Sequence, residues 1–507
     1  MNFPAEFISS IRPLLGKETD LFLSALAGDA PAGFRLNPFK AARNPMKATV
    51  PLQRVLWSQW GYYPEERPAF TFDPLFHAGY YYVQEASSMF VEHIINELTT
   101  GPVACLDLCA APGGKSVSLL SALPGGSLLV SNEPVRRRAN VLSETMTKFG
   151  HPNVMVTNNT AKDFSAFPHL FDLALVDAPC SGEGMFRKDE TAVEEWSVHN
   201  VEMCAARQRD ILNDIWPALK PGGLLIYSTC TYNTVENEEN ALWAAGELGA
   251  AGEPGGTFVH VETAKEWGIS PSFNDRVTGY RFFPHKTRGE GLFVTVLKKA
   301  GTEADKTVSG LTGVKSKRKP SPYVKDRSVY TDVFVKPNEP NQTCLNCAVA
   351  GKRPILTNLL LSPEAFDFVE AGNRIVALPA VHSETLAALN ERLKTVSMGI
   401  EIGERKGKDF IPSHALAMSK DLNPEAFPRY EATYEEAVSY LRREAIALKD
   451  APKGYLLLTY KGEPLGFVKN LGNRANNLYP NEWRIRSGYL PEKTAEIFTP
   501  PAQSPDS

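Results

Sequence analysis

The sequence FDLALVDAPCSGEG, residues 171–184, decides the fold of this 507-residue chain. It begins as an apolar run and ends in an acid, a thiol and two glycines, which indicates a buried strand that delivers Asp177 and Cys180 to a loop. A second apolar run, residues 224–230, ends in another thiol, Cys230. Ligands of open α/β sheets bind outside the carboxyl ends of the strands. The acid and the two thiols are therefore expected at neighbouring strand ends.

The region around this stretch, residues 101–299, alternates short apolar runs with segments of helical periodicity. This alternation predicts an α/β domain with a Rossmann-like parallel sheet and helices on both faces. Strands are expected at residues 103–108, 127–131, 154–157, 171–176 and 223–228, with a closing strand pair at 257–261 and 291–298. Helices are expected at residues 115–122, 135–149, 201–219 and 235–247.

The rest of the chain divides into four further segments. Residues 1–100 predict an N-terminal α+β subdomain, residues 300–326 a linker, residues 327–445 a middle α+β domain and residues 446–507 a small β-barrel. The barrel is expected from short strands at 454–460, 465–470 and 483–486 that are separated by tight turns.

Basic and aromatic residues raise the question of nucleic-acid binding. In the N-terminal subdomain they are interleaved, which suits a single-stranded nucleic acid but equally suits the packing of a small domain. The basic run at 315–319 is either a solvated tether or an RNA contact. Four basic residues are candidates for phosphate contacts, with solvated side chains as the alternative: Arg35, Lys40, Arg187 and Lys188.

Composition limits the class of protein. Seven scattered cysteines, an odd number, argue against a disulfide framework and favour a reducing cytosol. The N-terminus lacks the pattern of a signal peptide, and no apolar run approaches the length of a membrane span. We therefore expect a cytoplasmic protein without a membrane segment.

A glycine-rich loop, residues 106–115, follows the first strand of the α/β region and opens a helix. Its glycine spacing fits neither a Walker loop nor the three-glycine dinucleotide pattern. Glu133 stands after the next strand, where nucleotide-binding folds place the acid that binds ribose. A loop and an acid in this arrangement fit a cofactor that contains adenosine; a tight structural turn is the alternative.

Two thiols and an acid suit the methylation of C5 in a pyrimidine. C5 is a poor nucleophile, and a thiolate that adds to C6 activates it by covalent catalysis. An acid near N3 and N4 of cytosine would stabilise the adduct, and a second group would help to release the enzyme. Packing as small hydrophobic residues is the alternative, and it is the interpretation preferred for Cys105 and Cys204. These considerations leave open which thiol attacks.

Three strings of residues now point to a family: LDLCAAPGGKS (106–116), DAPCSGEG (177–184) and STCTYN (228–233). They resemble the Nop/Sun family of RNA 5-methylcytosine methyltransferases. The strings YVQEASS (82–88), GMFRKD (184–189) and PHKT (284–287) are similar to those of its RsmF-type (YebU-like) bacterial members, which act on small-subunit rRNA. The tail from Lys453 is similar to the PUA-like RNA-binding domain of those enzymes.

The resemblance implies roles for individual residues. Cys230 would be the nucleophile, Cys180 would help to release the product, and Asp177 would lie beside both cofactor and target base. S-adenosylmethionine would be the cofactor, with Glu133 on its ribose and Asn159, where many relatives have an acid, near its adenine. The complete set expected to bind the cofactor is Cys109, Ala110, Ala111, Pro112, Gly113, Gly114, Lys115, Glu133, Asn159 and Asp177.

The expected activity is therefore cytosine-C5 methylation of RNA, with small-subunit (16S) rRNA as substrate and the protein acting as a monomer. Two alternatives stay open at this point: a tRNA methyltransferase with the same chemistry, and a non-catalytic RNA-binding protein of ribosome assembly. No metal is expected, because Cys344 and Cys347 provide only half of a zinc site.

Overall fold

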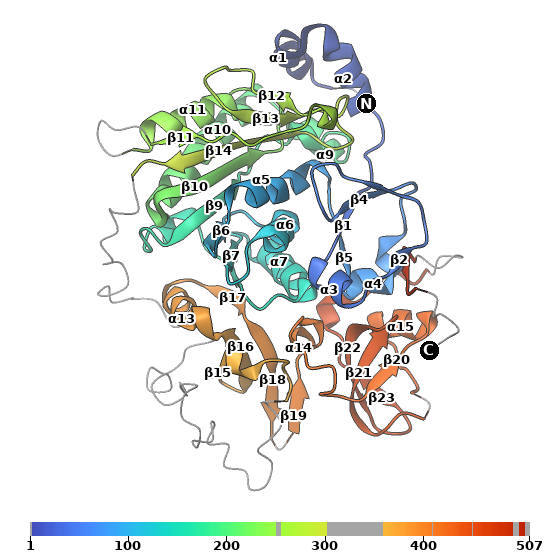
Figure 1. The fold of residues 1–507 in the computed structure, drawn as a ribbon. Coiled ribbons are helices and arrows are strands. Elements are labelled where there is room, and N and C mark those ends of the chain that lie inside the picture. Colours follow the sequence, from blue (N-terminus) through green and yellow to red (C-terminus); the bar gives the residue numbers. More distant parts are fainter. Residues whose placement is uncertain are drawn as a thin grey trace.

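The computed structural model describes residues 3–249, 255–301, 358–407, 409–448, 450–489 and 496–501 (Figure 1). At its centre is a 10-stranded sheet with the order β12-β13-β14-β10-β9-β6-β7-β8-β17, and β11 pairs with β14. The strands of this sheet are β6 (Ala104–Asp107), β7 (Leu128–Asn132), β8 (Val154–Thr157), β9 (Phe171–Asp177), β10 (Leu219–Thr229), β11 (Gly256–Phe258), β12 (Ser270–Pro271), β13 (Gly279–Phe282), β14 (Leu292–Lys299) and β17 (Thr395–Met398).

The five parallel strands, β6 to β10, are those predicted from the sequence, and the predicted closing pair is β11 and β14. The sheet is nevertheless mixed rather than parallel. β14 runs antiparallel to β10 and carries the antiparallel strands β11 and β13, of which β13 was not predicted. The opposite edge is closed by β17, which comes from the C-terminal part of the chain and pairs antiparallel with β8.

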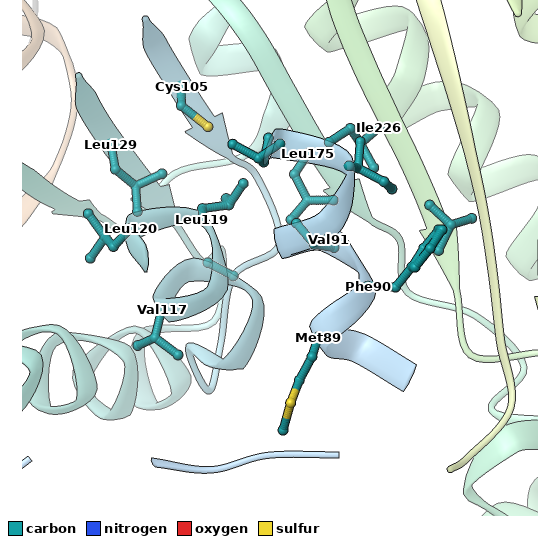
Figure 2. Packing of buried hydrophobic residues seen from close by; sticks show 14 of the residues in the cluster. Met89, Phe90, Val91, Cys105, Val117, Leu119, Leu120, Leu129, Leu175 and Ile226 are labelled. Carbon is teal, nitrogen blue, oxygen red and sulfur yellow. The ribbon is translucent and has the colours of Figure 1, made fainter. Parts of the chain in front are cut away.

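Helices cover both faces of the central sheet, as expected. Because successive side chains of a strand point to opposite faces, Cys105 packs into the core on one face and Leu106 into the core on the other. Figure 2 shows the first of these cores, in which α5 and α6 pack on the sheet. The covering helices are α5 (Phe90–Leu98), α6 (Gly114–Ala122) and α7 (Arg136–Phe149) on this face, and α8 (Ala161–Phe164), α10 (Val198–Ile215), α11 (Glu238–Glu247) and α13 (Ser383–Arg392) on the other.

The N-terminal part consists of a helical hairpin and a small sheet of order β3-β4-β1-β5. The hairpin lies against the loops after β9 and β10, where Phe7 contacts Phe186 and Phe22 contacts Tyr232, each edge to face. The elements are α1 (Ala5–Leu15), α2 (Thr19–Leu26), β1 (Phe34–Leu36), α3 (Pro38–Arg43), β2 (Lys47–Ala48), β3 (Leu52–Arg54), β4 (Gly61–Pro64), α4 (Pro74–His77) and β5 (Tyr81–Val83).

A short segment of this part, residues 35–40, docks on the helices of the central domain and is called the docking segment below. Arg35 is fully buried, and its guanidinium donates to Ser118 Oγ at 2.6 Å and to Glu92 at 3.1 Å. Burial of an unpaired guanidinium would cost far more than burial of this hydrogen-bonded pair. The pair therefore fixes β1 against α5 and α6.

Two further residues of the docking segment bind the C-terminal end of α7, next to α3 in Figure 1. The Asn37 side-chain amide donates to the Phe149 carbonyl at 2.8 Å, and Lys40 Nζ donates to the Lys148 carbonyl at 3.0 Å. Helices end with carbonyls that lack partners within the helix, and these two donors satisfy them. Lys40 is only 1% exposed, so it is not available as a phosphate contact.

The C-terminal part contains two sheets of four strands, β15-β16-β18-β19 and β20-β21-β22-β23. The second sheet includes the strands predicted at 454–460 and 465–470. It has β20 and β23 at its edges, so a closed barrel is not confirmed for the described residues. The elements are β15 (Phe366–Ala371), β16 (Arg374–Pro379), β18 (Ile400–Lys406), β19 (Asp409–Pro412), α14 (His414–Met418), β20 (Arg429–Glu431), α15 (Tyr434–Leu441), β21 (Gly454–Tyr460), β22 (Glu463–Asn470), β23 (Ala475–Asn477) and β24 (Phe498–Thr499).

The strand predicted at residues 483–486 is wrong. Asn481–Trp483 is a turn of 3₁₀ helix, and the residues that follow it have no regular structure. Ile485 is buried between exposed arginines and donates a backbone hydrogen bond to Leu441 at 3.0 Å. The single buried residue Ile485 between two exposed arginines thus gave the alternating polar and apolar pattern of a strand.

Candidate active site

Three neighbouring parallel strands end at one edge of the central sheet and place the predicted residues there. β6 ends at Asp107, β9 ends at Asp177, and β10 ends at Thr229, one residue before Cys230. Because these strands are adjacent in the sheet, their carboxyl ends lie side by side. The sheet thus brings together the acid and both thiols that the sequence indicated.

The two thiols face each other across the ends of β9 and β10. Cys180 Sγ lies 3.1 Å from Cys230 Sγ, and both are free, partly exposed cysteines. Backbone hydrogen bonds join the two loops, from the Ala178 N–H to the Ser228 carbonyl at 2.9 Å and from the Gly184 N–H to the Cys230 carbonyl at 2.8 Å. A substrate atom at this edge can therefore be reached from both sulfur atoms.

Asp177 connects the glycine-rich loop to the thiols. Its Oδ2 lies 2.8 Å from Lys115 Nζ, and its Oδ1 accepts a hydrogen bond from Ser228 Oγ at 2.7 Å. Burial alone would lower the pKa of Lys115, but the charges of Asp177 and Cys230 raise that pKa on balance. The ammonium group is thus held charged beside the thiols, where a positive charge favours a thiolate.

The environment of Cys180 favours its protonated form. The hydrogen bond with Cys230, burial, and the negative charges of Cys230 and Glu236 raise the pKa of Cys180 well above its usual range. Burial, followed by the charge of Asp177, likewise raises the pKa of Cys109 in the glycine-rich loop. Cys180 is therefore suited to donate a hydrogen bond at neutral pH.

The glycine-rich loop is fixed to α7 at two points. Arg138 donates to the Ala111 carbonyl at 2.8 Å, and Thr145 Oγ1 donates to the Pro112 carbonyl at 2.8 Å. Gly113 has a φ of 118°, and a Cβ there would come within 2.8 Å of Thr145 Cγ2. Only glycine fits at this position, and its absent side chain lets the loop lie close to α7.

Two buried carboxylates stand at the ends of β6 and β7, beside the loop. Glu133 is 1% exposed, accepts a backbone N–H at 3.0 Å and lies 3.5 Å from Arg138. Asp107 Oδ2 accepts a hydrogen bond from Ser116 at 2.6 Å, but its Oδ1 has no partner within the described ranges. Burial, with a contribution from Asp177, raises the pKa of Asp107 to about 7. A buried carboxylate oxygen without a donor fits a ligand that brings hydroxyl or amino groups.

Asn159 follows β8, and its side chain is held by the turn between α13 and β17. Its Oδ1 accepts from the Lys394 N–H at 3.1 Å, and its Nδ2 donates to the Lys394 carbonyl at 3.4 Å. The Asn158 N–H donates to the same carbonyl at 2.9 Å. The Asn159 amide keeps one hydrogen and one lone pair for a ligand, so its contact with an adenine stays a prediction.

The remaining basic candidates from the sequence, Arg187 and Lys188, share one carboxylate partner. Arg187 Nε lies 2.6 Å from Glu290, and Lys188 Nζ lies 3.1 Å from the same carboxylate. Arg187 also donates to the Gly289 carbonyl. Arg35, Lys40 and Arg187 therefore hold parts of the chain together, whereas Lys188 is exposed and its contact with a phosphate stays a prediction.

Two glutamates near the thiol loops, Glu183 and Glu236, were not predicted as site residues from the sequence. Glu183 belongs to the stretch that ends the β9 loop, Glu236 follows the Cys230 loop, and both are fully buried. The sequence did contain a signal for Glu183, which stands between two glycines and close to Cys180. An acid in such a turn can be buried, and a buried carboxylate needs hydrogen-bond donors from neighbouring residues. Those donors are described below with the further inference.

Other expectations concern metals, membranes and the remaining cysteines. Within the described ranges, no helix is long and apolar enough to cross a membrane, and no group of three or more His, Cys, Asp or Glu side chains could hold a metal ion. Cys105 and Cys204 are buried, as the packing interpretation expects. Cys344, Cys347 and the basic run at 315–319 lie outside the described residues.

Three family models match successive parts of the chain. The N-terminal domain of 16S rRNA methyltransferase RsmF matches residues 3–86, and 16S rRNA methyltransferase RsmB/F matches residues 99–298. The methyltransferase RsmF PUA domain matches residues 427–485. The RsmB/F match contains the glycine-rich loop and both thiols.

Curated proteins match over nearly the whole length. Ribosomal RNA small subunit methyltransferase F of Enterobacter sp. (strain 638) is 29% identical over 508 residues, which cover 96% of this chain and 97% of that protein. The protein of the same name from Escherichia coli (strain K12) is 28% identical, over 96% of this chain and 98% of its own. Among solved structures, PH0851 has a TM-score of 0.51 at 22% identity, over 59% of this chain and 66% of its own, and shares the fold. The chain belongs to the RsmF-type family of ribosomal RNA small-subunit methyltransferases.

Proposed function

We propose that this protein transfers a methyl group from S-adenosylmethionine to C5 of a cytosine in 16S rRNA. The observation that carries the proposal is the pair of thiols 3.1 Å apart, with the Lys115–Asp177 ion pair beside them. The names of the curated relatives support small-subunit rRNA as the substrate. We further propose that the protein acts in the cytoplasm, as a monomer.

S-adenosylmethionine supplies an electrophilic methyl group on a positively charged sulfur. The glycine-rich loop from Cys109 to Lys115 would surround it. Glu133 would accept hydrogen bonds from the ribose hydroxyls, because its carboxylate stands at the end of β7. Asn159 and Asp177 would complete the site, and the unsatisfied Asp107 oxygen fits a donor-bearing ligand at this edge.

Attack on the base falls to Cys230. Its thiolate forms a bond from Sγ to C6 of cytosine, and the electrons of the C5–C6 double bond then make C5 the nucleophile. Lys115 stabilises the thiolate by its charge. Asp177, whose side chain is 30% exposed, accepts a hydrogen bond from the cytosine amino group and so holds the base in place.

Release of the product falls to Cys180. After methylation C5 carries both a hydrogen and the methyl group. Water takes the C5 proton, the electrons of the C5–H bond re-form the C5–C6 double bond, and the C6–S bond breaks with its electron pair returning to Cys230 Sγ. The protonated Cys180 thiol at 3.1 Å donates a hydrogen bond to this departing thiolate and so favours its departure.

The roles of the thiols are tested with RNA, labelled cofactor and denaturing gels. We expect Cys230→Ala to form no methylated RNA and no covalent complex. Cys180→Ala should accumulate a covalent RNA–protein complex, because attack remains possible while release does not. Normal product release by Cys180→Ala, or methylation by Cys230→Ala, would contradict the assignment.

The substrate is tested by bisulfite sequencing of rRNA and tRNA from a deletion strain. Loss of a 5-methylcytosine from 16S rRNA supports the proposal, whereas loss from tRNA alone assigns the same chemistry to the alternative substrate. A strain that loses neither modification points to the non-catalytic alternative. The same experiment identifies which cytosines are modified.

A further inference from the structure

Glu183 extends from the Cys180 loop to the backbone of the Cys230 loop. Its Oε2 accepts the N–H groups of Tyr232 at 2.7 Å and Asn233 at 3.0 Å. Its Oε1 accepts the Asn233 side-chain amide at 3.1 Å and Trp196 Nε1 at 3.0 Å. The carboxylate of one thiol loop therefore fixes the second and third residues after the other thiol.

Glu236 makes the opposite connection. It follows the Cys230 loop, and its carboxylate accepts both the N–H and the hydroxyl of Ser181, the residue next to Cys180; the N–H bond measures 3.0 Å. Gln208 donates to the same carboxylate at 2.7 Å, and Asn233 donates to it at 2.8 Å. Asn233 thus bridges the two glutamates.

Both oxygens of each carboxylate accept hydrogen bonds, from backbone N–H groups, side-chain amides, an indole and a hydroxyl. Burial raises the pKa of Glu236, and the hydrogen bonds from Ser181 and Asn233 oppose this rise. Because several donors hold each carboxylate, each connection is stiff. No lysine or arginine donates to either carboxylate in the hydrogen bonds of the described residues given above, so the connection depends on these neutral donors.

From this reciprocal arrangement we infer that Glu183 and Glu236 are positioning residues with different steps to support. Glu183 holds the Cys230 loop and so supports attack on C6. Glu236 holds the Cys180 loop and so supports release of the product. The inference rests on the proposed function for the identity of these steps. A displacement of about 1 Å in a reacting group can cost about 100-fold in rate, which makes these contacts kinetically important.

The test measures the two steps separately in single-turnover reactions with RNA and S-adenosylmethionine, followed on denaturing gels. Glu183→Gln should slow formation of the covalent complex by about 100-fold and leave its decay unchanged. The reason is that the glutamine NH₂ group would face N–H donors, with which it cannot form hydrogen bonds. Glu236→Gln should form the complex at nearly the wild-type rate and slow its decay, so that the complex accumulates. Slowing of both steps by the same factor in both variants, or of neither step, overturns the inference.

Glu463→Gln is the matched control. Glu463 is as deeply buried as Glu183, but it lies in β22 of the C-terminal part and pairs with Arg43 at the end of α3. This variant should lose stability without changing either step. If a site variant fails to fold, milder substitutions replace it. Trp196→Phe removes one donor to Glu183, and Ser181→Ala removes one donor to Glu236. The first should slow formation of the covalent complex and the second its decay, each by a smaller factor.

A second measurement does not depend on methylation. Diamide oxidises two adjacent thiols to a disulfide and is itself reduced to a hydrazine, so the rate of Cys180–Cys230 bond formation reports how the loops are held. Peptide mapping should show slower cross-linking in both glutamate variants than in Glu463→Gln. Wild-type cross-linking without any methylation would reject the proposed function alone, whereas equal cross-linking in all variants would reject the positioning role alone.

Discussion

The thiol edge and the docking segment use charged side chains in opposite ways. At the edge, Lys115 and Asp177 form an ion pair whose side chains keep 14% and 30% of their exposure, so a ligand can reach them. In the docking segment, Arg35 and Lys40 are closed off from solvent and donate hydrogen bonds to carboxylate, hydroxyl and carbonyl groups. The accessible ion pair at the thiol edge is available for the proposed reaction, whereas the buried charged groups of the docking segment hold parts of the chain together. Substitutions should therefore separate rate from stability between the two regions.

The largest effect is expected for Lys115→Met at the thiol edge. Methylation should fall by about 1,000-fold, because the cation that pairs with Asp177 beside the thiols is lost, as for removal of other preorganised electrostatic groups. The melting temperature should stay close to that of the wild type. Methyl transfer from labelled cofactor measures the rate, and thermal unfolding measures the melting temperature. A large loss of stability with a small loss of rate would contradict the proposed difference between the two regions.

Arg35→Met in the docking segment should have the opposite effect: stability falls while the rate of methylation does not. We expect a loss of about 3 kcal/mol in the free energy of unfolding, because Glu92 stays buried without its cationic partner. The rate of methylation by the folded fraction should not change. If Arg35 were a phosphate contact, the substitution would instead weaken RNA binding and reduce its salt dependence at unchanged stability, so denaturant titration and RNA binding together decide.

Asn37→Ala should have a smaller effect in the same region. Asn37 accepts the Phe39 N–H at the start of α3 and donates to the carbonyls of Gly79 and Phe149. Loss of the helix cap and of these bonds should cost about 2 kcal/mol in stability. Chemical denaturation measures the change, and Asn44→Ala, a side chain with one bond to the Lys461 carbonyl, provides the control.

The smallest effect is a dependence of stability on pH from Lys40. Burial lowers the pKa of Lys40 to about 7 in the folded protein, while the unfolded chain retains the usual value of 10.5. The unfolded state therefore binds more protons between these values, and the contribution of Lys40 to stability rises with pH across that window. The difference in unfolding free energy between wild type and Lys40→Met should increase by about 1 kcal/mol per pH unit above pH 7.

Denaturant titrations at pH 6.5, 7.5 and 8.5 would show this trend. Lys47→Met, which removes an exposed lysine, should show no such trend. A difference for Lys40→Met that stays flat, or that falls as the pH rises, would mean that the lysine remains charged in the fold.

Much of the thiol edge could be predicted because its signals are local. Each apolar run of strand length ends in a polar residue, and adjacent parallel strands bring those ends together. The positions of Asp177, Cys180 and Cys230 followed from this rule alone. The identity of the attacking thiol did not, because it depends on the neighbours of each sulfur, such as Lys115 and Glu236.

The docking segment could not be predicted in the same way. A basic residue next to aromatic ones has the same local pattern whether it faces solvent or a buried carboxylate. Arg35 meets its partner Glu92 57 residues away, and Lys40 meets Lys148 108 residues away. Such pairings arise only from the tertiary fold, and the pairing of β17 with β8 was missed for the same reason.

The pairing of β17 with β8 has a consequence for biosynthesis. Lys394, next to β17, lies 235 residues after Asn159, next to β8. At a synthesis rate of about 5–20 residues per second, β8 waits roughly ten seconds to a minute for its neighbour. During that time the nascent chain carries an unprotected sheet edge, which is a site for pairing with other chains. Chaperone engagement of the ribosome-bound chain should therefore end only after residue 398 has left the exit tunnel.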